Sequence, residues 1–116
     1  FGVRCTFAAN GVIPPLDTTR SLQVYRIAQE AVHNSIKHGQ AEGISVRLER
    51  QESMMSLQVE DDGIGLPAKR KLTGMGLTIM KHRAAALGGS LEIGPGTQRG
   101  TLVRARWRLS EQKEKI

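Results

Sequence analysis

The chain has 116 residues, a formal net charge of +6 and 39% apolar residues. This length suits one compact domain with a modest core, and the apolar fraction is too high for a disordered chain. No stretch approaches the roughly 18 apolar residues of a membrane span, and the first residues do not resemble a signal peptide. We therefore expect a soluble, cytoplasmic protein. Because the chain starts at Phe1 without Met, we expect a fragment of a longer one.

The positive charge predicts an affinity for anions, a class that includes nucleic acids, acidic lipids, nucleotides and acidic proteins. Aromatic residues make up only 3% of the chain, which leaves few side chains on which bases could stack. We therefore expect no nucleic-acid partner, and a basic nucleic-acid-binding module remains an alternative. The single cysteine, Cys5, cannot form an internal disulfide, which favours a reducing compartment. Its position in VRCTF predicts a small buried residue rather than a reactive thiol.

Hydrophobic periodicity and turn residues divide the chain into seven elements. Alternating apolar residues predict strands, spacing of three and four predicts helices, and Gly39 and Gly88-Gly89 mark the helix ends. The elements are a strand at 3–7, a helix at about 21–38, strands near 44–48 and 55–59, a helix at about 77–87, and strands near 91–93 and 101–109.

This order of elements predicts an α+β fold. Because consecutive hairpins favour antiparallel pairing, we expect a mixed, mostly antiparallel sheet covered on one face by helices, which is a two-layer α/β sandwich. Residues 1–109 form one domain, and residues 110–116 form a charged tail. In the last strand Arg104, Arg106 and Arg108 alternate with apolar residues, which predicts a strand with one buried face and a solvated arginine face.

One face of the first helix collects polar side chains. Glu30, Asn34 and His38 are spaced at i, i+4 and i+8, and Lys37 follows Asn34 by three positions. The amide oxygen of Asn34 can ligate Mg²⁺ without adding charge, and Lys37 can neutralise phosphate oxygens. The alternative is the ordinary polar face of an amphipathic helix, and on this cluster alone that alternative is favoured.

The segment DDGIG, residues 61–65, follows an apolar strand. A carboxylate at a strand end, such as Asp61, can accept a hydrogen bond from the exocyclic amine of a base. Gly63 and Gly65 would let the backbone approach a flat ring. A plain acidic turn is the alternative, because Asp-Gly is a common turn pair.

The segment GMG, residues 74–76, stands just before the second helix. Glycines such as Gly74 and Gly76 at a helix start free backbone N–H groups for phosphate, and the helix dipole adds attraction. The alternative is a flexible loop before a helix. The chain contains neither a P-loop motif nor G-x-G-x-x-G, which excludes the two commonest phosphate-binding motifs.

Taken in order, these segments resemble the nucleotide-binding boxes of the histidine-kinase ATPase family, which also includes gyrase, chaperone and mismatch-repair ATPases. The resemblance extends over residues 1–109 and implies the Bergerat-type ATP-binding fold. The phrases YRIAQEAVHNSIKHG and MGLTIMKHRAAALGGSLEI are most similar to the nitrate-sensor-type histidine kinases. The matching segments are EAVHNSIKH (30–38, N box), DDGIG (61–65, first glycine box), GMGL (74–77, second glycine box) and GPGTQRGT (94–101, last box).

The resemblance implies ATP and Mg²⁺ as cofactors and gives roles to individual residues. By it, Asn34 ligates Mg²⁺, Lys37 and His38 contact phosphates, and Asp61 accepts from the adenine amine. Thr101 supports Asp61, often through water. Glu30 is either a general base, as in the ATPase branch, or a residue that orients the metal shell. The implied ATP-binding set is Asn34, Lys37, His38, Asp61, Gly63, Gly65, Gly74, Gly76, Leu77 and Thr101, with Glu30 and Asn34 as catalytic residues.

The implied function is donation of the γ-phosphoryl group of ATP to a histidine on a separate dimerisation domain, for onward transfer to a response-regulator aspartate. The expected partners are the protein's own helical domain and a receiver domain, in a homodimeric parent that is cytoplasmic or the cytoplasmic part of a membrane-bound sensor. Two alternatives are a serine kinase of the anti-sigma-factor type and a nucleotide-sensing module without transfer activity.

The sequence departs from the family pattern in three places. The lid, residues 66–73, is short and lacks the phenylalanine box of orthodox kinases, and we expect it to become ordered around a triphosphate. The last box is longer than usual, with Thr97, Gln98 and Arg99 between its two glycines. None of the three histidines lies in a phosphoacceptor motif, so we do not expect the chain to autophosphorylate alone.

Overall fold

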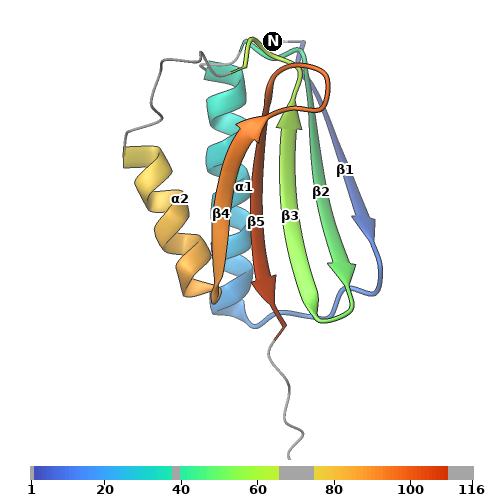
Figure 1. Ribbon diagram of the computed structural model, residues 1–116, viewed down its shortest axis with the longest axis vertical. Coiled ribbons are helices and arrows are strands. Elements are labelled where there is room, and N and C mark those ends of the chain that lie inside the picture. Colours follow the sequence, from blue (N-terminus) through green and yellow to red (C-terminus); the bar gives the residue numbers. More distant parts are fainter. Residues whose placement is uncertain (1, 38–39, 66–74, 110–116) are drawn as a thin grey trace, which may run out of the picture.

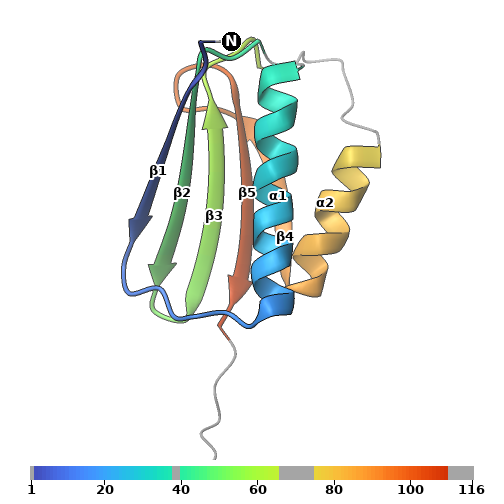
Figure 2. The same cartoon turned by 180° about the vertical axis from the view of Figure 1, so that it is seen from behind.

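The computed structural model describes residues 2–37, 40–65 and 75–109. Over these residues the chain forms one five-stranded sheet, and two helices cover one of its faces (Figures 1 and 2). The predicted two-layer α/β sandwich is therefore confirmed. The elements in chain order are β1 (Arg4–Asn10), α1 (Thr18–Lys37), β2 (Gly43–Gln51), β3 (Met54–Asp61), α2 (Met75–Ala86), β4 (Gly89–Pro95) and β5 (Thr101–Arg108).

The strands lie in the order β1-β2-β3-β5-β4. β1 and β2 are parallel, because α1 crosses over between them, and the other neighbours pair antiparallel. The sheet is thus mixed and mostly antiparallel, as the sequence predicts. The end of α1, the end of β3 and the start of β5 lie at the same end of the molecule, at the top of Figure 1. That end therefore collects three of the segments that resemble nucleotide-binding boxes, and the start of α2, with the second glycine box, lies lower in the picture.

The core lies between the sheet and the two helices. Alternate residues of β3 and β5 are buried, so each strand contributes one apolar face to the core. Trp107 of β5 and Ile27 of α1 are among the largest fully buried side chains, which are 2% exposed or less. Burial of this apolar area is the main force that holds α1 and α2 against the sheet.

The other face of the sheet is open and polar, with arginines along β5. Arg106 and Arg108 are exposed, while their neighbours Val103, Ala105 and Trp107 are buried. Arg104 Nη2 lies 3.1 Å from Glu92 Oε1 of β4 in a surface ion pair. The predicted solvated arginine face is therefore confirmed.

The structure corrects the sequence prediction at the N-terminal end. α1 begins at Thr18 rather than near Ser21, because Asp17 caps it: Asp17 Oδ1 accepts a 2.7 Å hydrogen bond from the Arg20 amide. The prediction that Cys5 is buried is wrong. β1 is an edge strand that is exposed along its whole length, and α1 packs on α2, β3 and β2 instead. No helix in the described ranges is long and apolar enough to cross a membrane.

Candidate nucleotide-binding site

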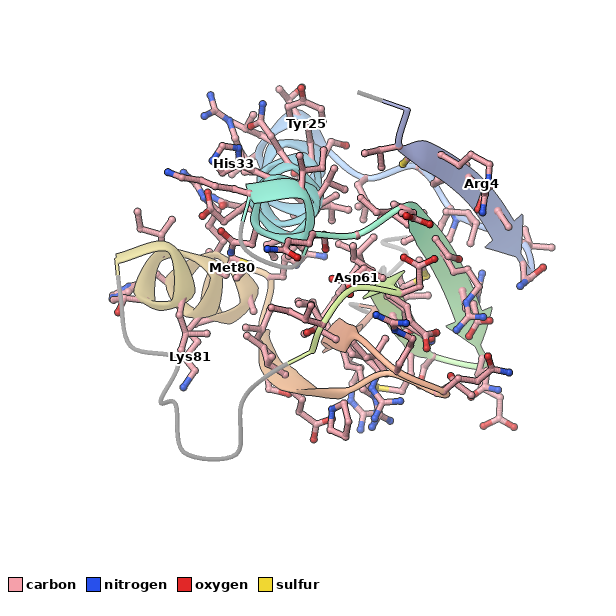
Figure 3. All side chains as sticks on the ribbon, turned by 90° about the horizontal axis from the view of Figure 1, so that it is seen from above. Arg4, Tyr25, His33, Asp61, Met80 and Lys81 are labelled. Carbon is pink, nitrogen blue, oxygen red and sulfur yellow. The ribbon has the colours of Figure 1, made fainter. Side chains whose placement is uncertain are left out.

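β3 ends in a buried carboxylate, that of Asp61. The side chain is 6% exposed and points to the helix-covered side of the sheet (Figure 3). Its Oδ2 accepts a 2.6 Å hydrogen bond from the Ser35 hydroxyl of α1. Its Oδ1 accepts from the amide of Gly63 at 2.9 Å and from the amide of Thr101 at 3.1 Å. Three segments that are distant in sequence therefore meet at one carboxylate.

In the part of the chain that the structure describes, the donors to this carboxylate leave it partly available to a ligand. A carboxylate offers about four acceptor positions, and the donors from Ser35, Gly63 and Thr101 use three of them. The same donors fix both oxygens in orientation, which preorganises the remaining position. Asp61 can thus serve as a rigid acceptor for one N–H group of a bound molecule.

Glycine is required where the last box meets Asp61. Gly100 has φ +83°, in the left-handed region, and a Cβ on it would lie 2.6 Å from Asp61 Oδ1. Gly65 also has a positive φ, +78°, and a Cβ there would lie 3.1 Å from the Gly100 carbonyl oxygen. The two glycine segments therefore pack directly on each other and on Asp61.

The polar face of α1 points toward the start of α2. Glu30 and Asn34 are half-buried, and Lys37, the last residue of the helix, is exposed. The Glu30 carboxylate lies against Gly76, where a Cβ would collide with its Oε2. The N-box segment and the second glycine box therefore face each other across a short distance.

The remaining predicted site residues are distributed around these contacts. Leu77 is half-buried in the first turn of α2, and Gly63 is buried. His38, Gly74 and the lid at 66–73 lie outside the described residues. The binding role of each residue stays a prediction, because the geometry shows only which of them come together.

The donor set suits a magnesium ion that a ligand helps to hold. Asn34 and Glu30 supply an amide and a carboxylate oxygen one helical turn apart. Within the described ranges, no three His, Cys, Asp or Glu side chains gather closely enough to hold a metal. The phosphates of a nucleotide would have to supply further ligands, which is how proteins commonly bind Mg²⁺.

Sequence reasoning missed Ser35, although it lies inside the N-box segment. Ile27, Ala31 and Ser35 are the buried positions of α1 and recur every four residues. A polar residue at such a core position needs a buried partner, and that requirement could have identified it. Thr101 contacts Asp61 directly through its backbone amide, at 3.1 Å, and a water-mediated contact between them stays a prediction.

Asp62, the neighbour of Asp61, has a structural role. Its Oδ1 accepts 2.9 Å hydrogen bonds from the amides of Glu42 and Gly43, at the start of β2. Both bonds lower the pKa of the Asp62 carboxyl below its ordinary value, and the bond from Gly43 has the larger effect. Asp62 therefore anchors the start of β2 to the end of β3.

A hollow of about 520 Å³ lies on the open side of the sheet, behind Asp61. No residue of α1 or α2 lines it, so a nucleotide bound there could not reach the N-box face. We therefore place the candidate site on the helix-covered side. The hollow is lined by Arg4, Thr6, Gly43, Ile44, Ser45, Glu60, Asp61, Asp62, Thr97, Gln98 and Arg99.

The element order, the mixed sheet, the meeting of three box-like segments at Asp61 and the contact of the fourth with Glu30 define a Bergerat-type α/β sandwich. The family model described as "Histidine kinase-, DNA gyrase B-, and HSP90-like ATPase" matches residues 19–111, and the chain belongs to this family.

Sensor kinases are among its curated relatives. The chain is 37% identical over 78 residues to the signal transduction histidine-protein kinase/phosphatase UhpB of Salmonella typhimurium, a match that covers 67% of this chain and 16% of UhpB. It is 34% identical over 101 residues to the nitrate/nitrite sensor protein NarQ of Escherichia coli, covering 85% of this chain and 18% of NarQ. The predicted resemblance to nitrate-sensor-type kinases is confirmed, and the chain spans only a small part of these relatives.

A solved structure confirms the fold. The histidine kinase domain from the Erythrobacter litoralis EL346 blue-light activated histidine kinase superposes with a TM-score of 0.78 at 23% identity. The match covers 97% of this chain and 54% of that one.

Proposed function

We propose that this chain binds ATP with Mg²⁺ and is the catalytic domain of a sensor histidine kinase. It would donate the γ-phosphoryl group to a histidine on a separate dimerisation domain of a homodimeric parent, on the cytoplasmic side. The phosphoryl group would then pass to an aspartate of a response regulator. Membership of the ATPase family and the similarity to sensor kinases support this proposal.

The observation that carries the proposal is the buried Asp61 carboxylate. Ser35, Gly63 and Thr101 hold it in orientation, and the donors within the described residues leave one of its roughly four acceptor positions free. An adenine amine is a donor of matching chemistry, and the backbone at Gly63 and Gly65 would let a flat ring approach. Guanine carries a carbonyl oxygen where adenine has this amine, so the same carboxylate would reject it.

The phosphates would lie between α1 and the start of α2. The N–H groups of the first turn of α2 and the helix dipole attract anions there. Lys37 would neutralise phosphate oxygens, Asn34 would hold Mg²⁺, and Glu30 would orient the ligands around it. When bound, Mg²⁺ supplies positive charge that stabilises the charge on the transferring phosphoryl group.

The acceptor histidine would come from outside the described residues. Its imidazole nitrogen attacks the γ-phosphorus: an N–P bond forms, the P–O bond to the β,γ-bridging oxygen breaks, and ADP leaves with the electron pair. His33 and His82 are exposed on α1 and α2, and Figure 3 shows His33 on the side of α1 away from Asp61. A separate domain is therefore needed to hold an acceptor in line.

Incubation with γ-labelled ATP tests this division of labour. We expect no label on this chain alone, and label on the dimerisation domain when that domain is added. Label on this chain alone would contradict the proposal. Acid-stable label on serine would favour the serine-kinase alternative, and ATP binding without any transfer would favour the nucleotide-sensing one.

A further inference from the structure

The turn that joins β4 to β5 is bound at two points to residues 60–63, the acidic segment at the end of β3, and neither point lies in the candidate nucleotide-binding site. The turn itself closes through a 3.0 Å hydrogen bond from the Gly96 amide to the Gly100 carbonyl. Its first attachment is the Thr97 amide, which donates a 2.5 Å hydrogen bond to Glu60 Oε2. Its second is Arg99 Nε, which donates a 3.1 Å hydrogen bond to the Gly63 carbonyl.

Glu60 lies on the opposite face of the sheet from its neighbour Asp61, because successive strand residues point to opposite faces. Its carboxylate packs against the turn so closely that a Cβ on Gly96 would lie 3.1 Å from Oε2. The hydrogen bond from the Thr97 amide is the main cause of a lowered pKa for Glu60, and it outweighs the opposing effect of burial. Glu60 therefore holds the turn as an ionised acceptor.

Arg99 completes the attachment at Gly63. The Gly63 carbonyl accepts from Arg99, while the Gly63 amide donates to Asp61 Oδ1. The same short peptide segment thus contacts the turn on one side and the buried carboxylate on the other. The next residues after Arg99 are Gly100 and Thr101, whose amide is the third donor to Asp61.

The path from the turn to the pocket is therefore short and continuous. Glu60 and Arg99 set the position of the turn, and the turn sets where the Thr101 amide lies. That amide and the Gly63 amide together fix Asp61 Oδ1. The three residues between Gly96 and Gly100, which make the last box longer than usual, supply both attachments.

We propose that Glu60 and Arg99 form a clamp that holds turn 96–100 on the acidic segment and so sets the base selectivity of the site through Asp61. Glu60 bonds to Thr97 and Arg99 to Gly63, so both would act on the proposed base contact through Asp61, as positioning residues. If the clamp opens, the Thr101 amide leaves Oδ1, and Asp61 loses the fixed orientation that discriminates an amine-bearing base. This inference rests on the proposed contact between Asp61 and the adenine amine.

The test compares two nucleotides on the whole chain. ATP carries the N6 amine, and N6,N6-dimethyl-ATP cannot donate from that position, so the ratio of their dissociation constants reports on the amine contact. We expect Glu60→Ala and Arg99→Ala to weaken ATP binding about 2- to 10-fold and to leave the analogue nearly unchanged. Arg104→Ala is the matched control: it removes an open-face arginine that is paired with Glu92, away from the turn, and should leave the ratio unchanged.

Two further variants separate positioning from simple loss of structure. Arg99→Lys keeps a charged N–H donor and should recover part of the ratio lost in Arg99→Ala. Glu60→Gln keeps the shape of the side chain and one acceptor oxygen. It replaces Glu60→Ala in the test if circular dichroism shows that the alanine variant does not fold. An unchanged ratio in folded Glu60 and Arg99 variants overturns the clamp.

The outcome for the clamp is distinguishable from that for the proposed function. When wild type binds ATP and Asp61→Asn loses selectivity while the clamp variants keep it, the clamp is wrong and the ATP site stands. When wild type shows no affinity for ATP, the proposed function fails, and the clamp fails with it.

Discussion

The Ser35 hydroxyl and the Asp61 carboxylate form a 2.6 Å hydrogen bond in the interior, between the last turns of α1 and the end of β3. Both residues are 6% exposed. Because Ser35 directly follows Asn34, this bond sets the position of the N-box face relative to the acidic segment. The phosphate-side and base-side residues of the proposed site are thereby fixed to each other.

Ser35→Ala should lower the free energy of unfolding by about 1–3 kcal/mol, because it leaves a buried carboxylate oxygen without its donor. Urea unfolding followed by circular dichroism measures the change. Ser90→Ala is a suitable control, since Ser90 is exposed on β4. Equal stability losses in the two variants would show that the Ser35–Asp61 bond contributes little.

Asp61→Asn should reduce ATP affinity about tenfold or more while the fold persists. The Asn oxygen can still accept from Gly63 and Thr101, and its NH₂ group can donate to the Ser35 hydroxyl. Asp61→Ala is the harsher change, because it leaves three donors unpaired in addition to the loss of the amine contact. Titration calorimetry and circular dichroism together distinguish the two effects, and unchanged ATP affinity in folded Asp61→Asn would move the base contact elsewhere.

The sheet and both helices could be predicted from sequence because their signals are local. Alternation along β3 and β5 and the apolar spacing of α1 arise from burial of one face of each element. The Gly88-Gly89 pair marked the end of the second helix for another local reason, because Gly88 adopts a positive φ, +81°, that other residues rarely adopt. α2 ends at Ala86, just before these glycines, and β4 begins at Gly89, as the turn residues indicated.

The contacts that join the boxes could not be predicted in the same way. Ser35 and Asp61 are 26 residues apart, and Thr97 and Glu60 are 37 apart, so no periodicity links them. The exposure of Cys5 depends on which strands the helices cover, which is a property of the tertiary arrangement. Local patterns therefore located the candidate site, and the structure alone gave its hydrogen bonds.

Gly100→Ala should destabilise the fold by about 2 kcal/mol or more, since φ is +83° and the new Cβ would press on Asp61. Gly94→Ala is the matched control: a Cβ there meets nothing within 4 Å, so its effect should be small. Thermal or urea unfolding of both variants gives the comparison. A Gly100→Ala protein as stable as Gly94→Ala would show that the last box relaxes away from Asp61.

Stability should fall as the pH drops below the ordinary carboxyl values of 4.5 for Glu60 and 3.8 for Asp62. Both pKa values are lowered in the folded state, by the amide of Thr97 for Glu60 and by that of Gly43 for Asp62. Each group therefore contributes stability that is fully present above its ordinary value and is lost as the pH falls through its lowered folded value.

Urea midpoints between pH 7 and pH 3 measure this dependence. Glu60→Gln cannot ionise at that position and should show a shallower loss of stability on acidification. Glu92→Gln, on the open face, serves as the control for removal of a surface charge. Identical pH profiles for wild type and Glu60→Gln would mean that the Thr97–Glu60 bond does not contribute to stability.

ATP binding should depend on Mg²⁺, and this dependence should require Asn34. The side chain lies half-buried on the face of α1 that points to the start of α2, one turn from Glu30. A metal that is held by an amide oxygen and by phosphates couples the protein to the triphosphate. Removal of the metal or of the amide oxygen therefore weakens the complex. Wild type should bind ATP at least several-fold more tightly in Mg²⁺ than in EDTA, and Asn34→Ala should bring the two affinities close together.

His33→Ala is the control for this measurement, because His33 is the preceding residue of α1 and lies on the side away from Asp61 (Figure 3). It should keep the full difference between Mg²⁺ and EDTA. Calorimetry on the three proteins under both conditions gives six affinities, and the comparison is made within each protein, so a general loss of stability does not imitate the effect. Equal affinity of wild type with and without Mg²⁺ would remove Asn34 from the proposed metal site, and a Mg²⁺ effect that survives in Asn34→Ala would assign the metal to other ligands, such as Glu30.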